Sequence, residues 1–245
     1  MQKQERIEQV LQIIKSRKFC TVEELVQELH YSPATIRRDL THLAQRELIQ
    51  KSYGGASYTG DRSFAVREHQ HTTVKMRLCH AASDLIQEGN TVFVDGTTTT
   101  YFLRDVLLKK QHLTVVTTNL KLAIDLCEQG VRCFVPGGQL CDTTMLGGAM
   151  TANALESFSF DVAFLSPGRI SHDGRFSIPE VFSGSTRAVL KNAQKCICLY
   201  HKEKLISHLP YCFGRLEIFD TVISDAEYPA TFQTDFPDTK FILVE

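Results

Sequence analysis

Two adjacent arginines, Arg37 and Arg38, follow a Ser-Pro pair in the segment YSPATIRRDLTHL, residues 31–43. A guanidinium group can bind phosphate oxygens or the two acceptors of a guanine edge, so this pair suits contact with nucleic acid. The same residues also suit a solvated helix surface, on which Asp39 or Glu47 would pair with them. The formal net charge of the chain is only -1, so any contact with DNA must be local.

The pattern around the arginines predicts a helix that presents them to solvent. Ser32 suits the N-cap position, and Pro33 suits the first helical position, where its missing N–H costs nothing. At about 100° per residue, Ile36, Leu40 and Leu43 share one face and are expected to be buried. The opposite side then carries Ala34, Arg38, Thr41 and Gln45, with Thr35 and Arg37 on its two flanks.

The neighbouring segments favour the nucleic-acid interpretation. Apolar residues at helical spacing predict a first helix around residues 7–14, and Thr21 with Glu24 forms a capping box that opens a second helix. Two short extended pieces, 48–51 and 53–56, predict a β-wing. Helices followed by a wing define a winged helix-turn-helix, whose third helix reads the major groove. The expected DNA contacts are Ser32, Ala34, Thr35, Arg37, Arg38, Thr41, Lys51 and Tyr53.

A second group of chemically suggestive residues follows strand-like runs later in the chain. Residues 95–100 in VFVDGTTTTYFL offer hydroxyl and backbone N–H groups at the start of a helical stretch, which suits a phosphate or sugar hydroxyls. Further runs end at residues 117–119, 136–138 and 167–169. Each signal alone fits a turn or a helix cap equally well. Because the carboxyl ends of parallel strands meet at one edge of a sheet, together they predict a pocket.

These runs, with two later ones in KCICLY and DTVISD, alternate with helical stretches, which predicts an α/β domain with a mostly parallel sheet. Cys196 and Cys198 alternate in KCICLY, which predicts a buried strand. We therefore expect a winged helix-turn-helix at 1–57, a linker at 58–73 and the larger domain at 74–245. The polar start and the lack of any apolar run of about 20 residues indicate a cytoplasmic protein with no membrane partner. Eight cysteines without zinc-ligand spacing indicate free thiols, and we expect neither a metal nor a cofactor.

The segment TVEELVQELHYSPATIRRDLTHLAQRELIQKSYGGA resembles the N-terminal module of the DeoR family of bacterial transcription regulators, chiefly through TIRRDL and the closing GGA. The resemblance covers nearly the whole chain. It implies a C-terminal domain similar to ribose-5-phosphate isomerases and CoA transferases, which senses a phosphorylated sugar or related metabolite. With the turn at 95–100 included, the expected effector residues are Lys75, Asp95, Gly96, Thr97, Thr98, Thr99, Thr100, Asn119, Gly137, Gly138 and Lys204.

The sequence departs from the family pattern at three places in the larger domain. Gly96 follows Asp95 directly, where the family often has one residue between them. Ser183-Gly184 stands where an acidic residue usually precedes a helix, and His201 replaces the aspartate of an Asp-x-x-Lys motif. Two carboxylates that could hold sugar hydroxyls are thus missing. The site would then bind a different ligand, depend on the protonation of His201, or be weakened.

The leading hypothesis is a DNA-binding transcriptional regulator, a repressor of a carbohydrate-use operon that acts as a homo-oligomer on a double-stranded operator. A phosphorylated ligand in the larger domain would modulate it. An alternative is a sugar-phosphate isomerase, for which Asp95, Glu180 and Lys204 are the candidate groups. A third possibility is a regulator whose larger domain only oligomerises. The missing carboxylates argue against catalysis, so we expect no enzyme activity.

Overall fold

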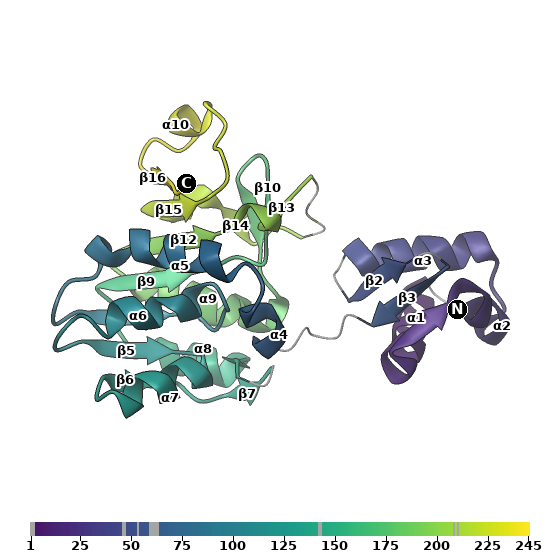
Figure 1. Ribbon diagram of the computed structural model, residues 1–245, viewed down its shortest axis with the longest axis horizontal. Coiled ribbons are helices and arrows are strands. Elements are labelled where there is room, and N and C mark those ends of the chain that lie inside the picture. Colours follow the sequence, from purple (N-terminus) through teal and green to yellow (C-terminus); the bar gives the residue numbers. More distant parts are fainter. Residues whose placement is uncertain are drawn as a thin grey trace. The chain divides into compact units, whose positions relative to one another are not determined.

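The computed structural model describes residues 3–45, 48–52, 54–58, 64–141, 144–207, 209 and 211–245 of the 245-residue chain. Contacts divide the chain into two compact units, Met1–Ser63 and Phe64–Glu245 (Figure 1). The smaller unit has one hydrophobic core. The larger unit has two cores, which lie on opposite faces of a central sheet.

The smaller unit is a winged helix-turn-helix with three helices and a three-stranded antiparallel sheet (Figure 1). The strand order is β1-β3-β2, so β3 pairs with both of the other strands. The predicted order of helices and wing is confirmed. The sequence pattern does not predict β1, because three residues are too few to show an alternation of polar and apolar side chains. The strand that pairs with β1 is also distant in the chain. The elements are α1 (Lys3–Arg17), β1 (Phe19–Thr21), α2 (Val22–Leu29), α3 (Pro33–Gln45), β2 (Ile49–Ser52) and β3 (Gly55–Tyr58).

Hydrogen bonds at the helix ends follow the local sequence. The Thr21 hydroxyl accepts the backbone N–H of Glu24 at 3.1 Å, and the Glu24 carboxylate accepts the N–H of Thr21 at 2.7 Å. This is the predicted capping box of α2. His30 ends α2 in the left-handed conformation, with φ 57°, and donates its N–H to the Val26 carbonyl. The core includes Ile7, Val10, Ile14, Leu25, Ile36, Leu40, Leu43 and Ile49, so the predicted inner face of α3 is buried.

A seven-stranded sheet forms the centre of the larger unit, in the order β16-β15-β12-β9-β4-β5-β6, and every pairing in it is parallel. The strands are β4 (Thr91–Val94), β5 (Thr114–Thr117), β6 (Arg132–Phe134), β9 (Val162–Leu165), β12 (Cys196–Tyr200), β15 (Thr221–Ser224) and β16 (Lys240–Leu243). The first six coincide with predicted strand-like runs, so the α/β class with a parallel sheet is confirmed. The pattern does not indicate β16.

Short strands form two further sheets that the sequence pattern does not indicate. One has the order β13-β10-β11-β14, and the other pairs β7 with β8. Strands of two or three residues are too short to show an alternation of polar and apolar side chains. Their bounds are β7 (Gln139–Leu140), β8 (Leu146–Gly147), β10 (Arg169–Ser171), β11 (Arg175–Ser177), β13 (Leu205–Ile206) and β14 (Gly214–Arg215).

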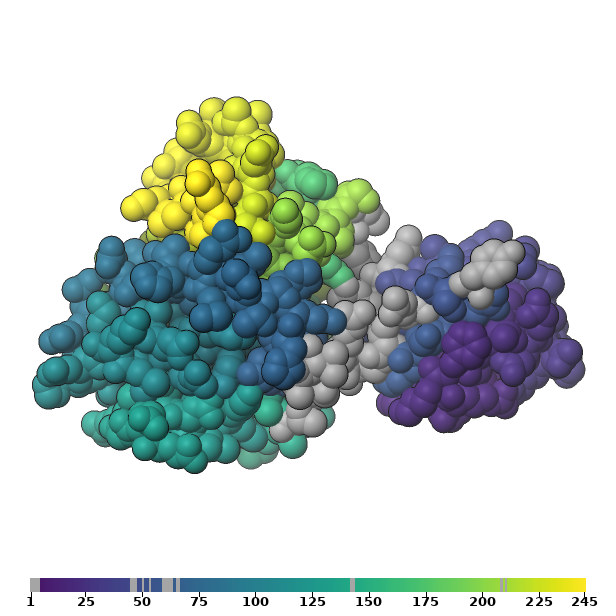
Figure 2. All heavy atoms as spheres, viewed as in Figure 1, coloured from purple at the N-terminus to yellow at the C-terminus, as the bar shows by residue number. Residues whose placement is uncertain are grey.

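Helices cover both faces of the central sheet (Figure 1). On one face lie α5 (Thr72–Ala81), α6 (Arg104–Leu107) and α7 (Leu120–Glu128), and on the other α8 (Ala149–Leu155), α9 (Glu180–Asn192) and α10 (Phe232–Asp235). Within β4, Val92 and Val94 join the first core while Phe93 joins the second, as expected for alternating side chains. The short 3-10 helices are η1 (Ser83–Leu85), η2 (Thr100–Leu103), η3 (Lys202–Lys204) and η4 (Leu216–Ile218). In the space-filling view the C-terminal segment forms a continuous yellow surface of this unit (Figure 2).

The segment expected to be a linker contributes to the larger unit. Residues 64–73 include α4 (Phe64–Glu68) and the start of α5, whereas residues 59–63 lie outside the described ranges. Phe64 is buried, and its ring meets that of Tyr101 edge-on with 5.5 Å between centroids. The Glu68 carboxylate pairs with Lys121 of α7 at 2.6 Å. These tertiary contacts hold a five-residue helix that is too short to be stable or apparent by itself.

No helix within the described ranges is long and apolar enough to cross a membrane. The eight cysteines are free thiols, and Cys196 and Cys198 are buried in β12 as the sequence predicts. Within the same ranges, no group of three or more His, Cys, Asp or Glu residues is arranged to hold a metal ion.

Candidate functional site

The outer face of α3 is open to solvent within its unit. Arg37 and Arg38 are exposed beside the small side chain of Ala34, which permits close approach of a partner. Hydroxyl groups of Ser32 and Thr41 lie at the two ends of this surface. Guanidinium and hydroxyl groups around a small residue have the chemistry of a helix that enters the major groove.

Asp39 is one of the two acidic residues that could pair with the arginines on a solvated surface, and it faces the core instead. Its side chain is fully buried and accepts hydrogen bonds from Arg6 of α1, at 2.6 Å from Nε and 3.0 Å from Nη2. The hydrogen bond with Asp39 raises the pKa of Arg6. Because Asp39 points inward, it does not neutralise Arg37 or Arg38. Among the described residues neither of these arginines forms an ion pair, and Glu47 lies outside them.

A hydrogen bond connects the wing to α3. The Lys51 ammonium of β2 donates to Thr41 Oγ1 at 3.0 Å. At the start of α3, Ser32 Oγ accepts the N–H of the half-buried Thr35 at 3.2 Å, which is the expected N-cap bond. Tyr53 lies outside the described residues, as does the side chain of Gln45. The other predicted DNA contacts form one surface, which we call the α3 surface: Ser32, Ala34, Thr35, Arg37, Arg38, Thr41 and Lys51.

In the larger unit, the turn after β4 is organised by the carboxylate of Asp95. Its Oδ1 accepts the backbone N–H of Thr97 at 3.0 Å and the hydroxyls of Thr97 and Thr100 at 2.8 and 2.6 Å. Its Oδ2 accepts the backbone N–H of Ser166, just after β9, at 2.6 Å. Burial raises the pKa of Asp95, and these hydrogen bonds oppose the rise. A carboxylate has about four acceptor positions, so Asp95 is saturated by protein donors.

Two lysine ammonium groups lie beside this turn. Lys75 of α5 is 2% exposed, and it donates to Thr98 Oγ1 at 3.0 Å and to the carbonyl of Arg67 at 2.6 Å. Lys204 of η3 donates to Ser166 Oγ at 2.6 Å and to the carbonyl that follows it, at Pro167, at 2.8 Å. Within the described part of the chain, both ammonium groups are held by neutral oxygens and neither has a carboxylate at ion-pair distance.

Both lysines are mostly protonated at pH 7, but their pKa values lie only slightly above that pH. Burial lowers the pKa of Lys75 to about 8, and the positive charges of Lys204 and Arg67 add to this effect. Burial also lowers the pKa of Lys204 to about 8, against the attraction of Asp95. An anion placed between them would relieve the repulsion and raise both values. Two ammonium groups held in this way are therefore suited to an anionic ligand.

His201 contributes a neutral imidazole at the end of β12. It is 8% exposed and stacks on His71, the N-cap residue of α5, with 4.8 Å between ring centroids. Burial, followed by the charge of Lys204, lowers the pKa of His201 to about 3, so the ring is neutral at pH 7. Its Nδ1 is buried without a hydrogen-bond partner. Ligand binding that requires a protonated His201 is therefore disfavoured.

Contacts join these residues into a closed ring at the carboxyl ends of β4, β9 and β12. Thr98 connects Lys75 to the Asp95 turn, and Ser166 connects Asp95 to Lys204. Lys204 donates its backbone N–H to the His201 carbonyl at 2.9 Å, and His71 accepts the backbone N–H of Lys75 at 3.0 Å. We call this set the effector ring: Arg67, His71, Lys75, Asp95, Thr98, Ser166, His201 and Lys204.

Other predicted effector residues support the turn after β4. Asn119 is buried as the N-cap residue of α7, and its Nδ2 donates to the Gly96 carbonyl at 3.3 Å. A Cβ atom at Gly96 would lie 3.1 Å from the Met145 side chain and 3.2 Å from Thr118 Oγ1, so glycine permits close packing here. Thr99 is buried, and its carbonyl accepts the Cys79 thiol. These residues pack at the turn after β4 and support its conformation.

Gly137 and Gly138 lie in the exposed loop after β6. Thr151 Oγ1 is 2.7 Å from the Gly137 carbonyl and 2.8 Å from that of Gly147. A Cβ atom at Gly138, where φ is 122°, would collide with Thr151 Oγ1. Among the described residues no hydrogen bond joins either glycine to the effector ring, so their contact with a ligand stays a prediction.

Of the three candidate catalytic groups, Asp95 and Lys204 are joined through Ser166, whereas Glu180 does not join them within the described residues. Glu180 is exposed at the first position of α9, and within the described residues it makes no contact with Asp95 or Lys204. Ser183 and Gly184 lie inside α9 rather than before it. A Cβ atom at Gly184 would be 3.1 Å from that of Ala152, so this glycine lets α9 approach α8.

Four residues of this region are absent from the effector residues that the sequence predicts. Arg67 and His71 fall in the segment interpreted as a linker, Ser166 directly precedes the predicted strand end at 167–169, and Arg169 belongs to that end. The cationic cluster REHQHTTVK directly before a helix was the available signal for the first two. Ser166 and Arg169 are identified only when the parallel strands are set side by side.

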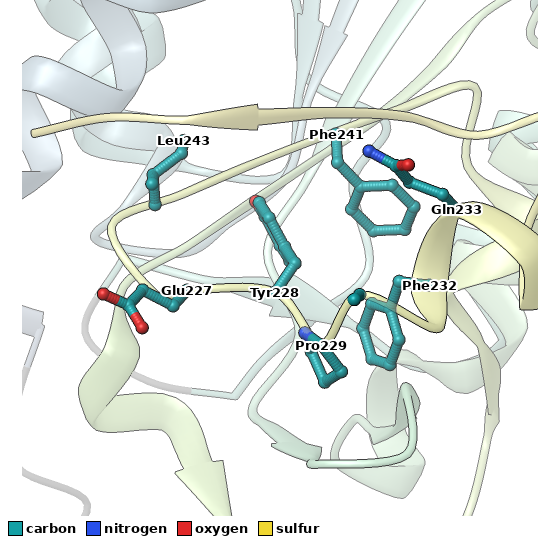
Figure 3. Close-up of a pocket in the computed structure, with 8 residues that line it drawn as sticks. Glu227, Tyr228, Pro229, Phe232, Gln233, Phe241 and Leu243 are labelled. Atoms are coloured by element: carbon teal, nitrogen blue, oxygen red, sulfur yellow. The ribbon is translucent and has the colours of Figure 1, made fainter.

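Surface hollows occur at another place in the larger unit. One of about 420 Å³ is lined by Glu227, Tyr228, Pro229, Ala230, Phe232, Gln233, Phe241 and Leu243 (Figure 3). A neighbouring one of about 210 Å³ extends toward Ser171 and His172. The described residues that line the first hollow present three aromatic rings and one carboxylate but no cation, which does not suit an anionic ligand. We therefore place the candidate site by the chemistry of the effector ring rather than by the size of a hollow.

The α3 surface and the lysines of the effector ring lie in two segments that match known protein families. Residues 6–61 match the DeoR-like helix-turn-helix domain, and residues 70–226 match the DeoR C-terminal sensor domain. The chain therefore belongs to the DeoR family of transcriptional regulators. The α3 surface lies in the first match, and the lysines of the effector ring lie in the second.

Three curated relatives illustrate the similarity. The chain is 29% identical over 240 residues to the glycerol-3-phosphate regulon repressor of Escherichia coli strain K12, with 94% of each chain covered. It is 28% identical over 247 residues to the transcriptional regulator GlpR of Haloferax volcanii, covering 98% of this chain and 97% of that one. It is 25% identical over 252 residues to the lactose phosphotransferase system repressor of Lactococcus lactis, with 99% of each covered.

Two solved structures give partial matches to this chain. Ribose 5-phosphate isomerase from Methanocaldococcus jannaschii gives a TM-score of 0.42 at 14% identity, over 57% of each chain. The eIF2B delta subunit from Chaetomium thermophilum gives 0.48 at 16% identity, over 67% of this chain and 60% of that one. These likenesses concern the fold alone, whereas the curated relatives that cover the chain are regulators.

Proposed function

We propose that this chain is a transcriptional repressor that binds operator DNA through the α3 surface and is controlled by a phosphorylated metabolite at the effector ring. The observation that carries the proposal is the inward pairing of Asp39 with Arg6, which leaves Arg37 and Arg38 exposed. A chain of net charge -1 thereby keeps two adjacent positive charges on the outer face of a helix. Such a local charge suits phosphate and guanine contacts in a groove.

The effector ring supports the second part of the proposal. Phosphate oxygens accept hydrogen bonds from ammonium and hydroxyl groups, which Lys75, Lys204 and Thr98 supply. No carboxylate of the described residues competes at ion-pair distance for either lysine. Two relatives are named for glycerol 3-phosphate and for a lactose phosphotransferase system. These names agree with a phosphorylated polyol or sugar as the ligand of this chain. We infer control of carbohydrate-use genes. Symmetric operators are read by paired helices, so the chain is proposed to act as a homo-oligomer.

Genomic DNA selection tests this proposal directly. The full chain is incubated with sheared genomic DNA from its source organism, and the retained fragments are sequenced. We expect a few short segments with two-fold symmetric half-sites, about 10 base pairs or a multiple of this apart. Phosphorylated three- to six-carbon compounds are then added one at a time, and one of them should release the DNA. Uniform retention of all fragments would contradict specific operator binding, and failure of every compound would favour a larger domain that only oligomerises.

The lysine pKa values predict how effector binding depends on pH. Lys75 and Lys204, each with a pKa of about 8 in the free protein, lose their charge as pH rises through 8. A phosphate monoester loses its second negative charge as pH falls below about 6. Affinity for a phosphorylated ligand should therefore be highest between about pH 6 and 8, and should decline on both sides. Isothermal titration at pH 5 to 10 measures this, and an affinity that rises continuously above pH 8 would contradict the assignment.

The two carboxylates that the isomerase alternative would use as a base are not available in the described structure. The Asp95 carboxylate is occupied by Thr97, Thr100 and Ser166, and Glu180 is exposed at the start of α9. A general base must lie within hydrogen-bond reach of the proton that it removes. We therefore propose that the ring binds its ligand without converting it.

A further inference from the structure

We infer that two copies of this chain join edge to edge through β6 and through apolar side chains that lie beside it. These side chains, which we call the β6 surface, are Phe134, Val135, Leu140 and Met150. The inference rests on the proposed homo-oligomer and specifies which surface of the larger unit brings two copies together.

The β6 surface is exposed in the single chain, and neighbouring contacts gather its residues. Met150 and Leu140 are 74% and 54% exposed. The pairing of β7 with β8 sets Leu140 opposite Leu146, which precedes Met150 at the start of α8. Next to Met150, Thr151 Oγ1 lies 2.7 Å from the carbonyl of Gly137, in the loop between β6 and β7. These contacts hold the start of α8 and β7 beside the end of β6.

The end of β6 belongs to the same surface. The ring of Phe134 meets that of Phe158, just after α8, edge-on with 5.7 Å between centroids. Val135 is exposed, follows Phe134 directly and leads into the loop that Thr151 contacts. The four apolar side chains are therefore contiguous. Single exposed apolar residues are common on proteins, whereas a contiguous group marks a contact surface.

β6 (Arg132–Phe134) is an edge strand of the seven-stranded sheet (Figure 1). Among the described strands it pairs with β5 alone. The backbone N–H and C=O groups on its outer side therefore have no strand partner within the described chain. An exposed edge of this kind can pair with a strand of another chain.

The sequence around this edge contains few charged residues. Residues 133–155 contain one charged residue in 23 positions, Asp142, which lies outside the described ranges, whereas 22% of the whole chain is charged. Depletion of charged side chains distinguishes the centre of a protein–protein interface from ordinary surface. Because the β6 surface itself carries no charge, two copies of it can meet without repulsion between like charges.

A two-fold arrangement also pairs the arginine of β6 with an aromatic ring. Within the strand, the guanidinium of Arg132 lies over the ring of Phe134, 5.1 Å from its centroid. When two β6 strands pair antiparallel about Cys133, position 132 of one copy faces position 134 of the other. Each guanidinium then meets an aromatic ring rather than a second guanidinium, and symmetry repeats this contact. We therefore assign the β6 surface to a second copy of this chain.

Sedimentation of the full chain, free and on an operator duplex, tests the inference. The variant Leu140→Lys/Met150→Lys places like charges on the β6 surface of both copies. Both positions are exposed, so the fold should be retained, as the thermal midpoint shows. We expect the dissociation constant of the paired chains to rise at least about 100-fold, because burial and repulsion of the ammonium groups oppose association.

The matched control is Ile218→Lys/Leu243→Lys. It places the same charges at two other exposed apolar residues of the larger unit, and Leu243 lies on β16 at the opposite edge of the sheet. Its dissociation constant should stay within about twofold of the original value. Unchanged association in Leu140→Lys/Met150→Lys, or equal weakening in the control, would overturn this interface and leave the homo-oligomer in place. A chain that is monomeric both free and on DNA would overturn both.

Hydrogen exchange locates the contact within the pair. Amides of residues 132–135 should exchange at least about tenfold more slowly above the dissociation constant than below it, because strand pairing and burial protect them. Amides of β16 serve as the internal control, and their exchange should not depend on concentration. Exchange at 132–135 that is equally fast at both concentrations would contradict edge-to-edge pairing through β6.

Discussion

Replacing Arg37 and Arg38 together by alanine is expected to weaken operator binding by at least about 2 kcal/mol, or about thirtyfold in Kd. Both guanidinium groups are exposed on α3, and Asp39, the nearest acidic residue in sequence, is held by Arg6 at 2.6 Å. The double substitution therefore removes interactions with DNA rather than intramolecular pairs. Fluorescence anisotropy with an operator duplex recovered by genomic selection measures the change.

A matched variant separates direct contact from a general effect of charge. Lys109→Ala/Lys110→Ala removes two adjacent positive charges from the larger unit and should change operator affinity by less than about twofold. The salt dependence of binding should also become less steep in the arginine variant, by about one counterion for each DNA phosphate that the protein no longer neutralises. Unchanged affinity and salt dependence in Arg37→Ala/Arg38→Ala would exclude the α3 surface as the site of DNA binding.

Replacing Arg6 by alanine is expected to lower the free energy of unfolding of the smaller unit by about 3 kcal/mol. Asp39 is completely buried, so removal of Arg6 leaves its carboxylate without a cation in the protein interior. Hydrogen exchange of the α1–α3 amides in the full chain measures this change. In these helices the exchange should accelerate about 100-fold while that of the central sheet is unchanged.

Two further variants make this prediction specific. Arg17 lies on the same helix and pairs with Glu28 at 2.6 Å, but their side chains are 48% and 40% exposed. Because exposed pairs contribute little, Arg17→Ala should cost less than about 1 kcal/mol. The double variant Arg6→Met/Asp39→Leu removes both charges and should recover most of the stability lost in Arg6→Ala. A loss in Arg6→Ala no larger than that in Arg17→Ala would show that the buried pair is not a determinant of this fold.

The outer face of α3 was predictable because it depends on local periodicity. Ile36, Leu40 and Leu43 recur at the helical spacing, so the arginines between them had to face away from the core. The partner of Asp39 was not predictable in the same way. Arg6 is 33 residues away in the chain, and only the packing of α1 against α3 brings the two together.

The strands of the larger unit were also apparent as apolar runs, and their carboxyl ends identified the region of the effector ring. Arg67 and His71 were not predicted as site residues, because their segment was interpreted as a linker. The helix α4 is too short to show a periodic apolar pattern, and the burial of Phe64 holds it in position. Ser166 could not be linked to Lys204, 38 residues later, without the adjacency of β9 and β12.

By itself, the sequence determined the succession of helices and strands, the capping box of α2, the solvent-facing arginines and the family to which the chain belongs. These depend on short-range periodicity, caps and motifs, which a linear pattern records. Tertiary structure alone decided that Asp39 turns inward and that His201 is a neutral ring stacked on His71. It also decided that Lys75 and Lys204 lie in one ring of contacts, with no carboxylate of the described residues at ion-pair distance. Burial and charge proximity set these properties, and both arise only when distant segments pack together.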